Sequence, residues 1–253
     1  MTDHLAPNVS NQEVIEIIKS KINHNIPFCL SRFGDGEISV LKRRVVNEQI
    51  EKRYCRYYGY DHKTERDAFW NDAYNRVLPA LKHSDIIGFM DFETQIGTKI
   101  TKKYWTFSKE EYRKHTGFVA GPAMVCDHMI CRSEEFGTVE AIRDLCQGKG
   151  IHIISPNTKK LKEKKLEKIL ECDLTFTDHP FTINFNNRDP ILEQFKDIKA
   201  PVVLYGTSLN KDYGIILKQD YGKIAIDMGA TLDAWAGLIT KPWFETFQKH
   251  LVK

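Results

Sequence analysis

Short apolar runs alternate along the chain with longer segments in which apolar residues recur every three or four positions. Each run is rich in β-branched or aromatic residues and ends near Gly, Pro, Ser or Asp, which predicts a buried strand. Strands are predicted on this basis at 27–33, 85–90, 150–155, 174–177, 201–205 and 223–227. Helical spacing predicts helices at 11–23, 65–81, 134–146, 157–170, 189–198, 209–219 and 242–251.

This alternation predicts an α/β fold that is Rossmann-like, with a mainly parallel sheet and helices on both faces. A length of 253 residues falls short of two average domains, and the chain has no repeat or Ser/Gly-rich linker, so residues 1–253 are predicted to form a single domain. Sheets of this kind bind ligands at the carboxyl ends of their strands. The residues that follow each strand are therefore the first candidates for function.

The first predicted strand leads into the sequence SRFGDGE at 31–37. Asp35 and Glu37 form a D-x-E pair near the start of a helix, and paired carboxylates bind Mg²⁺ or Mn²⁺, usually together with phosphate oxygens. Arg32 carries a guanidinium whose shape suits phosphate. The alternative, which spacing alone does not exclude, is that both carboxylates only complement the helix dipole.

Two further strand ends carry polar side chains. Asp91 and Glu93 form a second D-x-E pair, which could bind a metal, accept the proton of an acceptor hydroxyl or bind a sugar hydroxyl. A helix N-cap with a solvated Glu is the alternative for this pair. Ser155 and Asn157 stand at the start of a helix, where free backbone N–H groups can bind an anion and the two side chains can contact a nucleotide.

The last two predicted strands end in Gly206-Thr207-Ser208 and in Asp227. Gly206 permits close approach of a ligand to the backbone, and the two hydroxyls can also cap the next helix. Lys211, in the first turn of that helix, could reach a phosphate. Asp227 could hold ribose or sugar hydroxyls or act as the base, and a cap with a turn aspartate is the alternative for this region.

Three strings resemble, in the same order, motifs of the GT-D-type bacterial glycosyltransferases: RFGDGE at 32–37, LYGTS at 204–208 and AIDMG at 225–229. That family has a Rossmann-like fold and a D-x-E motif for metal and nucleotide sugar. The resemblance implies a glycosyltransferase that uses Mn²⁺ or Mg²⁺ held by Asp35 and Glu37. It further implies a nucleotide-sugar donor, with UDP-glucose as the first guess, and a glycan or glycoprotein acceptor. Where the family often has a His after D-I-G, this chain continues with ATLD.

The candidate site follows from the strand ends and the resemblance together. The predicted catalytic residues are Asp35, Glu37, Asp91 and Glu93. The predicted nucleotide-sugar contacts are Ser31, Arg32, Gly34, Gly36, Ser155, Asn157, Gly206, Thr207, Ser208, Lys211 and Asp227.

Composition narrows the partners. The chain has 37 Lys+Arg against 34 Asp+Glu, a net charge of +3, so we expect no surface-wide field for nucleic acid and only local recognition of phosphate. No apolar run approaches the roughly 20 residues that span a bilayer, and the N-terminus does not resemble a signal peptide. The six scattered cysteines are typical of reduced thiols, which predicts a cytoplasmic protein. An oligomer remains possible.

Other interpretations stay open. A Rossmann-like S-adenosylmethionine-dependent methyltransferase would also place glycines and an acidic residue at strand ends, but it would need no metal. A non-catalytic basic module would use the lysine-rich segment 159–168 to bind nucleic acid or acidic lipid, although the paired acidic motifs argue against it. The segment YCRYYGYDH at 54–62 is predicted to be a loop whose tyrosines stack on a base or sugar, or pack in the interior.

Overall fold

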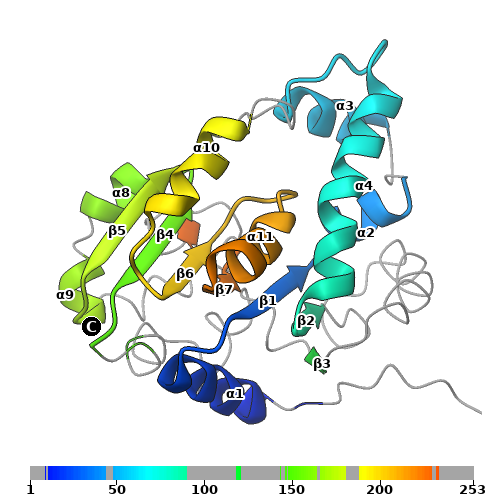
Figure 1. Ribbon diagram of the computed structural model, residues 1–253. Helices are drawn as coiled ribbons and strands as arrows, with labels where there is room; N and C mark the ends of the chain where they lie inside the picture. The colour runs from blue at the N-terminus through cyan, green and yellow to red at the C-terminus, as the bar shows by residue number, and fades with distance from the viewer. Residues whose placement is uncertain are drawn as a thin grey trace, which may run out of the picture.

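The computed structural model describes residues 9, 11–43, 48–89, 118–120, 143, 146, 148–163, 166–180, 188–229 and 232–233. Within these residues seven strands form one sheet in the order β3-β2-β1-β7-β6-β4-β5, and every pairing is parallel. Helices cover both faces of this sheet (Figure 1). The predicted α/β class with a mainly parallel sheet is therefore confirmed.

The strands correspond closely to the predicted apolar runs. They are β1 (Phe28–Phe33), β2 (Ile86–Phe89), β3 (Phe118–Ala120), β4 (Ile151–Ser155), β5 (Leu174–Asp178), β6 (Val202–Tyr205) and β7 (Ile224–Asp227). All but β3 were predicted from the sequence. Strand β3 was missed because three apolar residues are too few to distinguish a strand from any other short apolar run.

The helices are α1 (Asn11–His24), α2 (Asp35–Leu41), α3 (Glu48–Tyr57), α4 (Arg66–His83), α8 (Thr158–Glu163), α9 (Leu166–Leu170), α10 (Asp189–Gln194) and α11 (Asp212–Tyr221), with a 3₁₀ turn η3 (Phe195–Asp197) after α10. The predicted loop at 54–62 is wrong at its start, because 54–57 form the last turn of α3. The predicted helix 157–170 begins at Thr158, and its described residues form two short helices, α8 and α9. The predicted helix 242–251 and nearly all of 134–146 lie outside the described residues.

Alternation of side chains along β1 distributes the core between two layers. Phe28 and Leu30 belong to a buried cluster with the apolar stripe of α1, whereas Cys29 and Phe33 belong to a cluster with α4 on the opposite face. Figure 1 shows α11 beside α4 on that second face, with α1 on the other side of the sheet. No helix among the described residues is both long enough and apolar enough to cross a membrane.

The strand order brings β1 and β7, which lie far apart in the sequence, next to each other at the centre of the sheet. The chain leaves them toward opposite faces. After β1, Ile38 and Leu41 join the cluster with α4, whereas after β7, Met228 and Leu232 join the cluster with α1. Such a divergence is a topological switch point, where open α/β sheets bind ligands. The carboxyl ends of β1 and β7 are therefore the place to look for the site.

Candidate active site at the carboxyl ends of β1, β6 and β7

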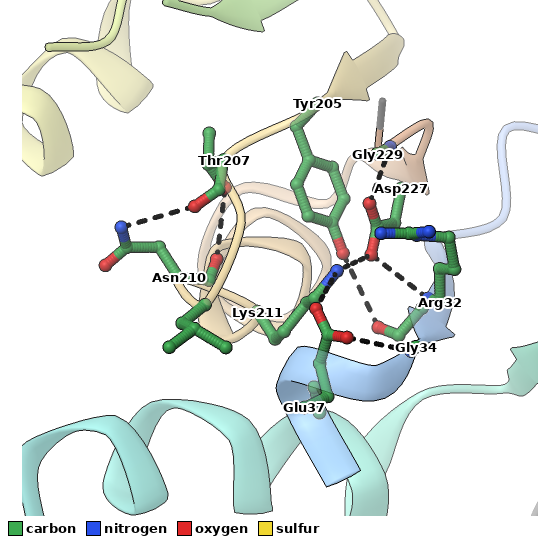
Figure 2. Close-up of polar contacts among 12 residues, drawn as sticks. Arg32, Gly34, Glu37, Tyr205, Thr207, Asn210, Lys211, Asp227 and Gly229 are labelled. Carbon is green, nitrogen blue, oxygen red and sulfur yellow. Dashed lines mark hydrogen bonds and ion pairs between the residues drawn. The ribbon is translucent and has the colours of Figure 1, made fainter. Parts of the chain in front are cut away.

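A buried ammonium joins two carboxylates at the switch point (Figure 2). Lys211 Nζ lies 3.0 Å from Glu37 Oε1 and 2.5 Å from Asp227 Oδ2. All three side chains are almost completely buried, the most exposed being Glu37 at 4%. The three residues come from α2, from the turn before α11 and from the end of β7, so the fold alone brings them together.

Backbone N–H groups occupy the remaining carboxylate oxygens. Glu37 Oε2 accepts a hydrogen bond from Gly34 N at 2.7 Å, which caps the first turn of α2. Asp227 Oδ2 also accepts from Arg32 N at 3.0 Å, and Asp227 Oδ1 accepts from Gly229 N at 3.0 Å. Glu37 thus caps α2 at its N-terminus, where the helix-dipole alternative placed its charge, and it also contacts Lys211.

The electrostatics of the cluster favour its charged form. Burial by itself raises the pKa of Glu37, but the positive charges of Lys211 and Arg32 outweigh it and hold that pKa below its ordinary value. Burial likewise lowers the pKa of Lys211, and the charges of Asp227 and Glu37 reverse this, so the Lys211 pKa is raised. The ammonium and the Glu37 carboxylate therefore both stay ionised at neutral pH.

Arg32 reaches across the site from β1 to the turn after β7. A Cβ atom built on Gly229 would lie 2.5 Å from Arg32 Nε, so only glycine leaves room for this guanidinium. Gly229 also has a φ of +50°, which favours glycine. Gly206 is equally close to the same turn, since a Cβ there would lie 2.6 Å from the Gly229 carbonyl oxygen. The close approach that was expected from a ligand at Gly206 is thus made by the backbone of the Gly229 turn.

The turn after β6 differs from its prediction. Thr207 and Ser208 were expected to cap a helix starting at 209, but α11 begins at Asp212, and its N-cap position is Lys211, with no side-chain cap. Ser208 has a φ of +52°, which a helix cannot contain, and Thr207 donates to the carbonyl of Asn210 instead. The turn delays the helix and directs the Lys211 side chain into the cluster (Figure 2).

Other predicted residues make contacts of their own at the carboxyl ends of β1 and β4. The Ser31 hydroxyl is buried, accepts a hydrogen bond from Ser84 at 2.7 Å and lies 3.4 Å from the Tyr205 hydroxyl. Ser155 accepts from the backbone N–H of Asn157, whose side chain donates to Asp233 Oδ1 at 2.5 Å. The Asn157–Asp233 bond links the end of β4 to the chain after β7.

The tyrosines of 54–62 were not among the predicted site residues, yet they support the site. Tyr58 and Tyr60 are buried in the cluster with α4, which confirms the interior-packing interpretation for these two. The Tyr58 hydroxyl accepts a hydrogen bond from the N–H of Leu209 at 2.9 Å. The Tyr54 hydroxyl would lie 3.4 Å from a Cβ on Gly36. The density of tyrosines was the only signal in the sequence that could have suggested this contact.

Only part of the predicted metal site falls within the described residues. The Asp35 side chain and the whole of the second pair, Asp91 and Glu93, lie outside them. Among the residues that are described, no three His, Cys, Asp or Glu side chains gather as a metal site would require. Both Glu37 oxygens already contact N–H donors, so the described groups do not fit a cation bound by Glu37.

Comparison with known proteins identifies a related family and a shared fold. The model of the GT-D fold-like domain matches residues 9–235. No curated protein matches the chain. A solved domain of unknown function 1792, described as having a distinct glycosyltransferase fold, is 17% identical with a TM-score of 0.57, covering 87% of this chain and 77% of that one. Another, described as a new glycosyltransferase from Streptococcus sanguinis, is 14% identical with a TM-score of 0.56, covering 93% and 84%. At these identities the likeness shows the fold.

Proposed function

Since this chain belongs to the GT-D-like family and is a glycosyltransferase, we propose that it transfers a hexose from a nucleotide sugar to a hydroxyl of a glycan or glycoprotein. UDP-glucose is the donor to test first. The observation that carries the proposal is the charged cluster at the switch point, where Arg32 lies beside the buried Glu37–Lys211–Asp227 set. Recognition of a diphosphate requires local positive charge, since the chain as a whole carries only +3, and in this cluster the Arg32 guanidinium supplies it.

The reaction sets a clear demand on the protein. When the bond between the sugar and the diphosphate breaks, negative charge develops on the leaving oxygen, and donors held in place beforehand stabilise it most effectively. Arg32 supplies a permanently charged, planar guanidinium that can bind two phosphate oxygens at once. Asp227 holds the Arg32 backbone, and Gly229 leaves space for its side chain, so the guanidinium is positioned from two sides.

The acceptor hydroxyl must lose a proton during transfer. Asp227 is 1% exposed, and both its oxygens accept hydrogen bonds from the chain, which makes it a poor base for an incoming substrate. Asp91 and Glu93 remain the predicted candidates for this role. Asp35 remains the predicted ligand for Mn²⁺ or Mg²⁺. The Glu37 half of that pair does not fit a cation. This proposal therefore assigns to Arg32 the stabilisation of the negative charge that develops on the leaving group.

The proposal is tested by nucleotide binding and donor turnover. We expect UDP and UDP-glucose, but not S-adenosylmethionine, to bind in calorimetry, and UDP-glucose to be hydrolysed slowly when no acceptor is present. Arg32→Gln should weaken UDP binding by about tenfold or more, which corresponds to the loss of a charge-assisted contact of about 1.5–3 kcal/mol. The assay is run with Mn²⁺, with Mg²⁺ and with a chelator.

The matched control is Arg43→Gln. Arg43 follows α2 and is exposed, and its guanidinium lies over the Tyr74 ring of α4. It should leave UDP affinity unchanged. Binding of S-adenosylmethionine in place of UDP would favour the methyltransferase, and an equal loss of affinity in both variants would remove Arg32 from the site.

A further inference from the structure

The Glu37–Lys211–Asp227 set has the geometry of a cation site whose cation is a side chain. Lys211 Nζ occupies the space between the two carboxylates, within 3.0 Å of each. A carboxylate that binds Mg²⁺ must approach it to about 2.0–2.1 Å and give up other strong donors. Glu37 cannot do so while one oxygen contacts the ammonium and the other caps α2.

Charge balance leads to the same conclusion. Two buried carboxylates facing each other would repel, and the space between them would attract any available cation. Lys211 removes that attraction, because it is 1% exposed and cannot exchange with solvent as an ion does. Arg32 adds a second positive charge close enough to affect the ionisation of both Glu37 and Lys211. A divalent cation bound by Glu37 would therefore meet two like charges.

We propose that Lys211 is the resident cation of this site, and that Glu37 is a positioning residue that holds Lys211 rather than a ligand of Mn²⁺ or Mg²⁺. The Lys211 ammonium and the Arg32 guanidinium together balance the two negative charges of Glu37 and Asp227, so an anionic donor can approach the switch point without net repulsion from the buried carboxylates. The inference rests on the proposed function only in its choice of UDP as a probe. It assigns a metal, if one is used, to other residues such as Asp35.

The first experiment asks whether Glu37 binds a metal. The Mn²⁺ affinity of the full chain is measured by electron paramagnetic resonance with UDP present. The unmodified protein is compared with Glu37→Gln and with the matched control Asp227→Asn. Each variant removes one of the two carboxylate charges that contact the Lys211 ammonium. We expect the Mn²⁺ affinities of Glu37→Gln and Asp227→Asn to differ by less than about tenfold. Absence of Mn²⁺ binding by the unmodified protein agrees with the proposal, whereas a larger loss confined to Glu37→Gln overturns it.

The second experiment removes the resident cation. Lys211→Met leaves the two carboxylates facing each other, so this variant should gain Mn²⁺ affinity by about tenfold or more, and Mn²⁺ should raise its Tm while leaving that of the unmodified protein nearly unchanged. The double variant Glu37→Gln/Lys211→Met should lose the gain. A folded Lys211→Met protein with no new Mn²⁺ affinity contradicts the proposal.

The design keeps the two proposals separate. If Lys211→Met does not fold with or without Mn²⁺, the comparison of Glu37→Gln with Asp227→Asn still decides the role of Glu37. If UDP does not bind to the unmodified protein, the proposed function fails, whereas the Mn²⁺ gain of Lys211→Met can be measured without any nucleotide.

Discussion

At the residue scale, Gly229 satisfies two separate requirements of the site. Its φ of +50° favours glycine, and a Cβ at this position would lie 2.5 Å from Arg32 Nε. We therefore predict that Gly229→Ala destabilises the protein by about 1–2 kcal/mol for the left-handed backbone alone and also displaces the guanidinium. Urea unfolding measures the first effect, and UDP affinity measures the second.

Gly222→Ala separates these two effects. Gly222 ends α11 with a φ of +65°, and the nearest atom to a Cβ there is Pro27 Cγ at 3.9 Å, an ordinary contact distance. This variant should show a similar loss of stability with unchanged UDP affinity. Equal UDP affinity in both variants would mean that Gly229 is needed for the left-handed turn but not for the position of the Arg32 side chain.

The residues of the site were found from the sequence more reliably than their roles. Arg32, Glu37 and Asp227 were predicted because each lies at, or shortly after, the carboxyl end of a strand, and parallel strands end at one edge of a sheet. Lys211 was expected to contact phosphate, whereas its ammonium contacts two carboxylates. That difference depends on the left-handed turn at Ser208, which the tertiary hydrogen bond from the Leu209 N–H to the Tyr58 hydroxyl helps to stabilise.

At the scale of elements, the pairing of β4 with β5 makes folding sensitive to pH. His152 on β4 lies 2.7 Å from the Thr175 hydroxyl and 3.0 Å from that of Thr177, both on β5. Burial, with a smaller contribution from the charge of Lys223, lowers the pKa of His152 to about 4. Below a pH of about 6.5, His152 is protonated in the unfolded chain but stays neutral in the folded chain. The free energy of unfolding therefore falls as the pH drops toward 4.

We predict a loss of about 2–3 kcal/mol from His152 between pH 6.5 and 4.5, measured by urea unfolding. His179, whose pKa burial also lowers to about 4, should contribute a similar amount. His152→Gln should therefore remove about half of this dependence. His24→Gln, at the exposed end of α1, is the control and should keep it. An unchanged dependence in His152→Gln would show that the histidine is already charged in the folded protein.

Elements were predictable where their pattern is local. The strands β1, β2, β4, β5, β6 and β7 each have an apolar run bounded by turn residues, and their predicted bounds agree with the structure to within a residue. Helix α3 was missed, and its last turn, 54–57, contains two tyrosines, Cys55 and an arginine, which show no helical period in so short a stretch. Tyr54 and Tyr57 of this turn pack against the buried cluster that includes α4, and Tyr58, directly after it, packs on Phe69 of α4. The local sequence cannot reveal these contacts.

At the scale of the whole molecule, the sheet joins early and late parts of the chain at its centre. The pairing of β1 with β7 holds together the edge formed by β2 and β3 and the edge formed by β4, β5 and β6. The charged cluster spans the same junction, since Glu37 follows β1, Lys211 follows β6 and Asp227 ends β7. Both the backbone ladder and the site therefore resist separation of the two halves.

We predict from this arrangement that residues 1–253 unfold as one cooperative unit. Native-state hydrogen exchange should give the same opening free energy for Ile87 on β2 and Ile153 on β4, which lie on opposite sides of the β1–β7 junction and are fully buried. UDP at about one hundred times its Kd should raise both values together by about 2.7 kcal/mol, because it binds at the junction. Two distinct opening free energies, with UDP protecting only one half, would instead divide the chain into separate folding units. They would also confine the nucleotide site to one of them.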